Sequence, residues 1–219
     1  MQFQKREPTL EEKKALKGRT NVEALLYALD QRMVGKTPVV LVGRASYEIG
    51  NEELTAKLRQ ALGEDPKIDE RTGRVLLTDD IDCYLTDEAQ AIVDAGHPDS
   101  YVAKLADCYV HALNERTLIL PKGWDHRVQN IPGQYENLEL KRLDPLDFVI
   151  CKGAAGRLKD IEFLRAFCNA TDIRQSAVEA KIQETTANAP LQLRFDAVSQ
   201  RHLRSLAGKL FPPPRIEIG

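Results

Sequence analysis

The spacing of apolar residues separates a mixed first part of the chain from a helical second part. Helical spacing is found in residues 21–33, 51–63, 87–96 and 99–115. Apolar runs or alternation typical of strands are found in 37–43, 75–87, 116–121, 126–131 and 137–143. From Asp144 onward the spacing is helical only, in 144–155, 156–170, 174–188 and 195–210. The pattern predicts an α/β fold, in which a small mixed sheet with flanking helices is followed by a helical C-terminal segment.

This change of pattern suggests three segments. Residues 1–37 form an N-terminal helical segment, which opens with a capping box of Thr9 and Glu12. Residues 38–143 form the α/β domain, and residues 144–219 form a helical segment with a tail. Three consecutive prolines exclude a helix in that tail, so residues 211–219 are expected to be extended.

Composition and charge exclude several classes of protein. With 31 basic and 33 acidic residues the formal net charge is -2, so no overall field recruits nucleic acid or an anionic membrane. No segment approaches the ~18 apolar residues of a membrane span, and the start lacks the apolar core of a signal peptide. We therefore expect a cytoplasmic protein that does not bind membranes. The four cysteines contain no C-x-x-C pair and are expected to be buried thiols.

Two aspartates interrupt the strand predicted for residues 75–87. Residues two apart in a strand lie on the same side, about 7 Å from each other, so Asp80 and Asp82 face one way and Ile81 and Cys83 the other. Such carboxylates repel each other unless a cation lies between them. Mg²⁺ (or Mn²⁺) is held by one or two carboxylates plus substrate phosphates, which a D-x-D pair can supply. The alternative is an acidic turn with solvated side chains.

The segment 43–50, GRASYEIG, follows a predicted strand and begins a helix. A glycine at such a junction can place backbone N–H groups and a helix N-terminus against a phosphate. The segment matches neither G-x-G-x-x-G nor G-x-x-x-x-G-K-[ST], so Rossmann and Walker sites are not supported. Ser46 would either bond a phosphate oxygen or cap the following helix, and the sequence leaves both open.

The order of apolar strand, glycine, helix and T-x-D-x-D resembles the nucleotidyltransferase fold of the polymerase β superfamily. Residues 143–168, LDPLDFVICKGAAGRLKDIEFLRAFC, are similar to the helical segment of a bacterial family of uncharacterised nucleotidyltransferase-like proteins. That family is related to the toxins of type IV toxin–antitoxin abortive-infection systems. The resemblance covers roughly residues 38–175. Within the helical segment, the residues that carry the resemblance are Pro145, Asp147, Lys152, Arg157, Lys159 and Asp160. Before this segment, the tryptophan in GWDHRV also matches the family.

The resemblance implies roles for residues of the first part. Gly43 would belong to the motif that binds the nucleotide phosphates, while Asp80 and Asp82 would carry the metal ions. Arg44 departs from the family, which usually has glycine or serine there, so this side chain would either block the triphosphate or contact it through its guanidinium. A complete site needs a third carboxylate on a neighbouring strand. Glu139 is the candidate, with an exposed strand glutamate as the alternative.

In the helical segment, Lys152 and Arg157 would contact a nucleotide phosphate and Asp160 would orient the lysine. The alternative is an ion pair or cap at a junction between two helices, because Gly153 and Gly156 indicate a break. The four histidines form no H-E-x-x-H motif and no zinc spacing with the cysteines, so none is expected to bind a metal.

These features predict a protein that binds a nucleoside triphosphate and Mg²⁺ at Asp80 and Asp82. If active, it would transfer a nucleoside monophosphate to an acceptor hydroxyl of an RNA or a protein. The relation to the toxins implies a toxin role and adds a cognate antitoxin as an expected partner. The alternative is a catalytically inactive module that keeps the fold and binds a nucleotide or a partner, since a fold by itself does not establish chemistry.

Overall fold

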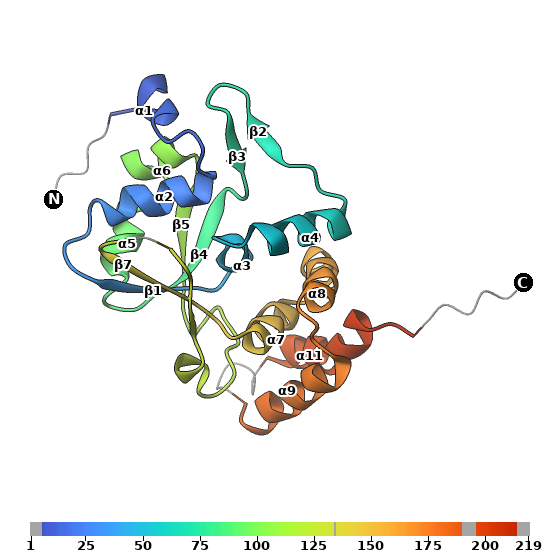
Figure 1. The fold of residues 1–219 in the computed structure, drawn as a ribbon. Helices are drawn as coiled ribbons and strands as arrows, with labels where there is room; N and C mark the ends of the chain where they lie inside the picture. The colour runs from blue at the N-terminus through green and yellow to red at the C-terminus, as the bar shows by residue number, and fades with distance from the viewer. Residues whose placement is uncertain (1–5, 134, 190–195, 214–219) are drawn as a thin grey trace, which may run out of the picture. The chain divides into compact units, whose positions relative to one another are not determined.

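The computed structural model describes residues 6–133, 135–189 and 196–213 (Figure 1). The chain forms two compact units and passes from one to the other several times. Unit 1 comprises Met1–Thr55, Glu64–Asn114 and Val128–Leu143, and unit 2 comprises Ala56–Gly63, Glu115–Arg127 and Asp144–Gly219. Residues 214–219 of the expected extended tail lie outside the described residues.

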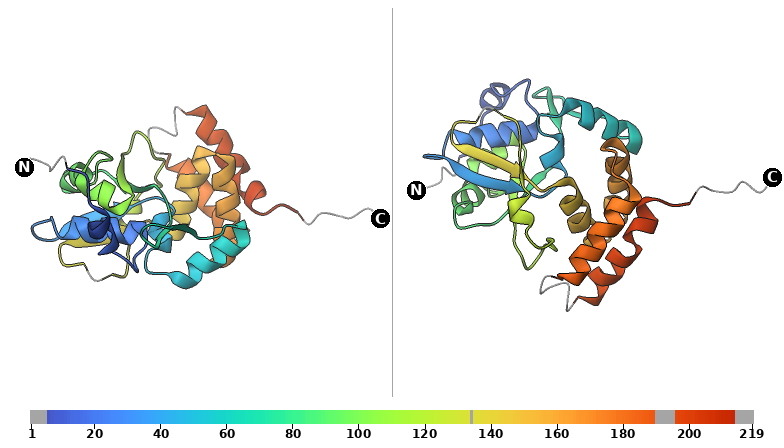
Figure 2. Two further views of the ribbon diagram at one scale, coloured as in Figure 1. Left: turned by 90° about the horizontal axis from the view of Figure 1, so that it is seen from above. Right: turned by 60° about the horizontal axis from the view of Figure 1, so that its bottom comes forward.

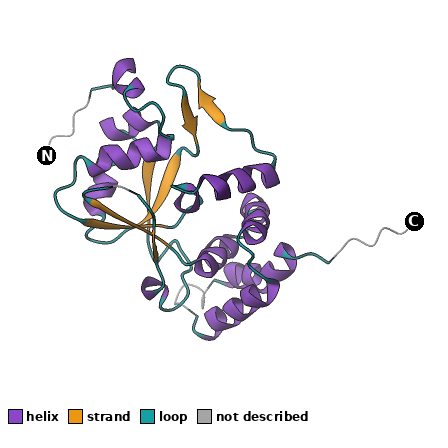
Figure 3. Ribbon diagram, viewed as in Figure 1, coloured by secondary structure: helices purple, strands orange, loops and turns teal. Residues whose placement is uncertain are grey.

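Unit 1 is built on a five-stranded mixed sheet with the order β5-β4-β1-β7-β6 (Figure 3). Its strands are β1 (Thr37–Leu41), β4 (Asp80–Tyr84), β5 (Tyr109–Leu113), β6 (Gln129–Asn130) and β7 (Leu138–Arg142). Strand β1 pairs antiparallel with β4 and parallel with β7, and β4 pairs parallel with β5. Strands β2 (Lys67–Asp69) and β3 (Arg74–Leu76) form a separate antiparallel pair.

The helices of unit 1 are α1 (Leu10–Lys14), α2 (Asn21–Asp30), α3 (Ala45–Glu48), α5 (Gln90–Ala95) and α6 (Tyr101–Ala106), and α4 (Glu52–Leu62) spans the division between the units. Helices α2, α5 and α6 cover one face of the sheet, and α1 packs on α6. The predicted capping box of Thr9 and Glu12 begins α1, and a second one begins α2. Apolar residues of α2, α5 and α6 form one core cluster with the inward-facing residues of β1, β4, β5 and β7.

The helix predicted for residues 99–115 is wrong in its second half. Helix α6 ends at Ala106, because Asp107 adopts the left-handed conformation with φ 55°, which aspartate tolerates better than most residues. The chain continues as β5, in which Val110 points to the core and Tyr109 and His111 point away from it. The strand predicted for 116–121 is also wrong, since these residues form a turn and loop in unit 2.

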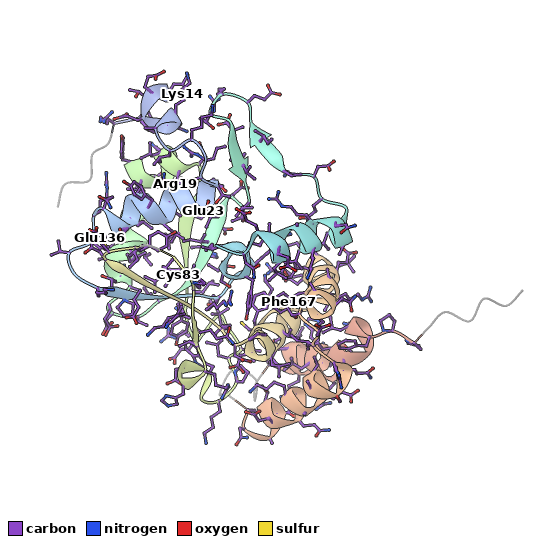
Figure 4. All side chains as sticks on the ribbon, viewed as in Figure 1. Lys14, Arg19, Glu23, Cys83, Glu136 and Phe167 are labelled. Atoms are coloured by element: carbon purple, nitrogen blue, oxygen red, sulfur yellow. The ribbon has the colours of Figure 1, made fainter. Side chains whose placement is uncertain are left out.

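Unit 2 is helical apart from its loops. Its helices are α7 (Pro145–Ala155), α8 (Leu158–Ala170), α9 (Gln175–Ala187) and α11 (Ala197–Leu210), and a short 3-10 helix, η1, covers Trp124–His126. The four long helices pack around a buried core (Figure 2). Three phenylalanines form part of it, with the ring centroids of Phe148 and Phe167 5.1 Å apart in an edge-on arrangement. Phe167 is labelled in Figure 4.

The predicted fold class is thus confirmed: a mixed sheet flanked by helices is followed by a helical C-terminal part. Among the described residues, no helix is both long and apolar enough to span a membrane.

The four cysteines are free and buried, as expected. Burial raises the pKa of the Cys83 and Cys108 thiols to about 12 and that of Cys168 to about 11, and the thiolate is the form that reacts. We therefore expect almost no reaction of the folded protein with Ellman's reagent at mildly alkaline pH, and release of four equivalents after unfolding in denaturant. Fast reaction of any thiol in the folded protein would contradict this burial.

Candidate metal site

The aspartate pair lies on the sheet face opposite to the core. Along β4 buried and half-buried residues alternate, with Ile81 and Cys83 pointing into the core. Cys83 is labelled in Figure 4. The side chains of Asp80 and Asp82 are 34% and 28% exposed and lie on the other face. The predicted division of this strand into a core face and an aspartate face is therefore confirmed.

Strand β5 brings a histidine to the aspartates. In the parallel pairing of β4 and β5, Asp82 lies opposite His111 and Asp80 lies opposite Tyr109. The Nδ1 atom of His111 is 3.1 Å from Oδ1 of Asp82 and 3.8 Å from Oδ2 of Asp80. One ligand atom from each of Asp80, Asp82 and His111 lies within 4.8 Å of the others, a grouping that could hold a metal ion.

Gly43 leaves the space that the Asp82 side chain fills. The glycine follows β1, and the neighbouring Val42 N–H donates to the carbonyl of Asp82 over 2.9 Å. A Cβ atom at position 43 would lie 2.6 Å from Oδ2 and 3.0 Å from Cβ of Asp82. A glycine is therefore required beside the aspartate pair for the carboxylate to keep its position.

Arg44 is held by two glutamates of the same unit. Its Nε donates to Glu48 over 2.8 Å, and its two terminal nitrogens donate to the two oxygens of Glu64 over 3.0 and 2.7 Å. Burial opposes the charged form, yet the carboxylates of Glu64 and Glu48 raise the pKa of Arg44 above its ordinary value. To contact a phosphate, the guanidinium would have to exchange these bonds.

Ser46 is buried within the first turn of α3. Its side-chain hydroxyl donates to the carbonyl of Gly43 over 2.7 Å, and the residue is only 1% exposed. This bond fixes the turn that follows Gly43, rather than directing the hydroxyl proton toward a ligand.

Glu139 lies away from the aspartate pair. It is on β7 opposite Pro38, two strands from β4, whereas Asp82 bonds to Val42 at the other end of β1. Pro38 and Val42 are four positions apart, which corresponds to about 13 Å along a strand. The side chain of Glu139 is 47% exposed, and Lys141 lies 3.5 Å from it. A role for Glu139 as the third carboxylate stays a prediction.

Lys152, Arg157 and Asp160 belong to unit 2, where both cations contact Asp160. Nζ of Lys152 lies 3.3 Å from Oδ1 of Asp160, and Nε of Arg157 donates to Oδ2. Gly156, with φ 68°, ends α7 between them, so the predicted break between two helices is confirmed. The side chain of Asp160 is 6% exposed and that of Arg157 is 57% exposed. The ion pair at a helix junction is therefore present, while contact with a nucleotide phosphate stays a prediction.

The carboxylates make the aspartate face electrically negative. Asp80 is the main cause that raises the pKa of Tyr109, the residue opposite it, and burial and Asp79 add to the effect. A phenol resists ionisation where negative charge is already concentrated. A cation bound at this face would gain from the same potential.

The donor set fits a divalent cation. Two carboxylates and one imidazole nitrogen within 4.8 Å of each other supply three ligand atoms from one side, and the partial exposure of all three side chains leaves room for water or a substrate oxygen. Asp80, Asp82 and His111 are thus the residues that would hold the ion.

A separate concavity in unit 1 contains none of these residues. It is lined by Lys17, Arg19, Glu23, Tyr27 and Tyr135 together with neighbouring backbone. Arg19 and Glu23 are labelled near α2 in Figure 4, on the helix-covered side of the unit. The candidate metal ligands therefore lie outside this concavity.

Spacing along the chain does not reveal His111, because a parallel strand and not a sequence motif brings it to the aspartates. The useful signal is the alternation of Cys108, Val110 and Ala112 with Tyr109 and His111, which fits a strand directly after a left-handed Asp107. The pairing partner of that strand cannot be read from the sequence.

Comparison with known proteins identifies a matching family. A family model described as nucleotidyltransferase of unknown function (DUF6036) matches residues 24–200, which is most of the chain. No curated protein and no solved structure matches the chain.

Proposed function

The chain belongs to the DUF6036 family of nucleotidyltransferases of unknown function, and from this premise we propose that it binds a nucleoside triphosphate together with a divalent metal ion at Asp80 and Asp82. The observation that carries the proposal is the grouping of two carboxylates and an imidazole on the sheet face that the core leaves free. A nucleotidyltransferase family suggests a nucleotide substrate, and enzymes of this chemistry generally use divalent metals.

The proposed reaction transfers a nucleoside monophosphate to an acceptor hydroxyl of an RNA or a protein and releases pyrophosphate. A bound divalent ion would neutralise phosphate charge and help to align the attacking oxygen. The residues of the chain have simpler tasks. Asp80 and Asp82 hold the ion, Gly43 keeps Asp82 in place, and the backbone after β1 lies beside the carboxylates, where a phosphate can be received.

Further parts of the proposal come from the resemblance. Lys152 and Arg157 would supply positive charge to the phosphates, with Asp160 fixing both side chains through its two ion pairs. A toxin role, with a cognate antitoxin as partner, is a hypothesis of the same origin. Metal binding at the aspartates does not depend on either of these assignments.

Calorimetric titration with the four ribonucleoside triphosphates, with and without Mg²⁺ or Mn²⁺, tests the proposed function without a guess about the acceptor. We expect binding that requires the metal in the natural protein, and no measurable binding in the Asp80→Asn/Asp82→Asn variant. The reason is that an amide neither neutralises nor ligates a hard cation as a carboxylate does. The thermal midpoint should stay unchanged or rise slightly, because two repelling charges are removed.

The matched control is Asp94→Asn/Asp99→Asn, which removes the same charge from two exposed aspartates of unit 1. It should bind nucleotide like the natural protein. Metal-dependent nucleotide binding that survives in the Asp80→Asn/Asp82→Asn variant would refute the assignment of these residues.

A second candidate function is a catalytically inactive module of the same fold. The occupied guanidinium of Arg44 favours it, since Glu48 and Glu64 take the bonds that a triphosphate would need. Such a module would bind a nucleotide or a partner without transferring a nucleoside monophosphate, and an absence of nucleotide binding under every metal condition of the same titration would favour the form that binds a partner.

A further inference from the structure

We infer that His111 is a third protein ligand and makes the site selective for a first-row transition-metal dication, represented by Mn²⁺, over Mg²⁺. This inference deepens the proposed function, because it concerns the metal ion at the same aspartates. Family and sequence motifs direct attention to the carboxylates, whereas the histidine follows from the pairing of β4 with β5.

The geometry favours ligation through Nδ1. This atom lies 3.1 Å from Asp82 and 3.8 Å from Asp80, so it faces the space between both carboxylates. Among the described residues, these aspartates are the only hydrogen-bond and ion-pair partners of the His111 side chain. The His111 side chain is 52% exposed. To turn toward an ion, it would have to give up only its hydrogen bond to Asp82.

Ligand chemistry then decides between metals. Mg²⁺ demands oxygen ligands in a near-ideal octahedron, so a nitrogen at one corner is a poor replacement. Imidazole suits first-row transition metals such as Fe²⁺, Ni²⁺ and Zn²⁺, whereas carboxylates and water suit both Mg²⁺ and Mn²⁺. Mn²⁺ shares the oxygen preference of Mg²⁺ but belongs to the transition-metal series, so it is the probe that accepts two carboxylates and the oxygens of a nucleotide and also reports on the imidazole.

A competing explanation assigns His111 only a hydrogen bond. In that arrangement Nδ1–H donates to Asp82 and orients the carboxylate, while the imidazole never touches the ion. The two explanations differ in whether nitrogen lies in the coordination sphere of the metal. They also differ in what an aspartate at position 111 would do.

The test uses the full chain and Mn²⁺ as the probe, with free Mn²⁺ measured by its electron paramagnetic resonance signal and Mg²⁺ affinity measured by competition. The electron spin echo of bound Mn²⁺ should carry a modulation from ¹⁴N. His111→Ala should lose that modulation and bind Mn²⁺ more weakly by at least the roughly 10–100-fold that loss of an outer-shell group costs, with a much smaller change for Mg²⁺. His111→Asp should bind Mg²⁺ more tightly than the natural protein.

His97→Ala is the matched control, since His97 is an exposed histidine of unit 1 that lies beside Asp99. It should keep the ¹⁴N modulation and the Mn²⁺ affinity. Bound Mn²⁺ without ¹⁴N modulation, or an unchanged preference in His111→Asp, would overturn the inference while leaving metal-dependent nucleotide binding intact. Mn²⁺ binding with ¹⁴N modulation but no nucleotide binding would support the inference and refute the proposed function.

Discussion

Replacing Asp147 by asparagine is expected to lower the free energy of unfolding of unit 2 by about 3–5 kcal/mol, the cost of removing one partner from a buried ion pair. Asp147 is fully buried. Its carboxylate accepts from Arg127 over 2.8 and 3.0 Å and lies 3.1 Å from Nζ of Lys181. Because asparagine is nearly the same size, the change removes the charge and leaves the packing almost unaltered.

Arg127 would then lose its carboxylate partner, and Lys181, which is 9% exposed, would keep only Glu184 among the described residues. The hydrogen bonds to the Asp147 carboxylate are the main cause that raises the pKa of Arg127 above its ordinary value, so the pair favours the charged guanidinium. Chemical denaturation followed by circular dichroism should report a lower midpoint with an unchanged slope, as expected for lost stability without a change in the surface exposed.

Glu184→Gln is the control, because Glu184 also pairs with Lys181 but its side chain is 47% exposed. An exposed pair contributes roughly 0–1 kcal/mol, so this variant should unfold close to the natural protein. Equal midpoints for both variants would show that the buried network contributes little. Asp147 belongs to the segment that resembles known nucleotidyltransferase-like proteins, and its contacts give it a structural role in unit 2.

Gly43→Ala is expected to weaken metal binding by about 10–100-fold, comparable to the loss of a group that orients a ligand. The added methyl would lie 2.6 Å from Oδ2 of Asp82, closer than atoms that are not bonded can approach. The end of the aspartate side chain can turn away more easily than the backbone can move. The carboxylate would therefore leave its place beside Asp80 and His111, with a small effect on folding.

Mn²⁺ titration and thermal unfolding of the same sample separate these effects. Gly208→Ala is the control, because a Cβ at that position of α11 meets no atom within 4 Å. It should leave metal binding unchanged and stabilise the helix by about 1 kcal/mol or less. Full Mn²⁺ affinity in Gly43→Ala would show that the position of Asp82 does not limit metal binding.

The spacing of apolar residues along the chain predicts those parts of the fold that depend on residues close together in the sequence. The two faces of β4 follow from a period of two, so the residue order alone places Asp80 and Asp82 on one side. The helices of unit 2 follow from apolar spacing, and the break at Gly156 follows from its left-handed conformation. These features depend on residues close together in the chain.

Features that depend on strand pairing could not be predicted in the same way. His111 meets Asp82 only because β5 lies parallel to β4, although 29 positions separate the two residues. Glu139 lies on a predicted strand, but that strand pairs with β1 on the side away from β4. A single sequence does not show which strands pair, so His111 can be identified as a candidate ligand only from the folded structure.

The pairing of β1 with β7 has a consequence for synthesis of the chain. Thr37 lies opposite Leu138, so about 100 residues must leave the ribosome before β1 meets this partner. At roughly 5–20 residues per second, that takes on the order of 5–20 s. During that interval the strand that leads to Gly43 has an unpaired edge, which is open to other chains. Nascent-chain chaperones would be needed most in this interval, before the central strand is closed on both sides.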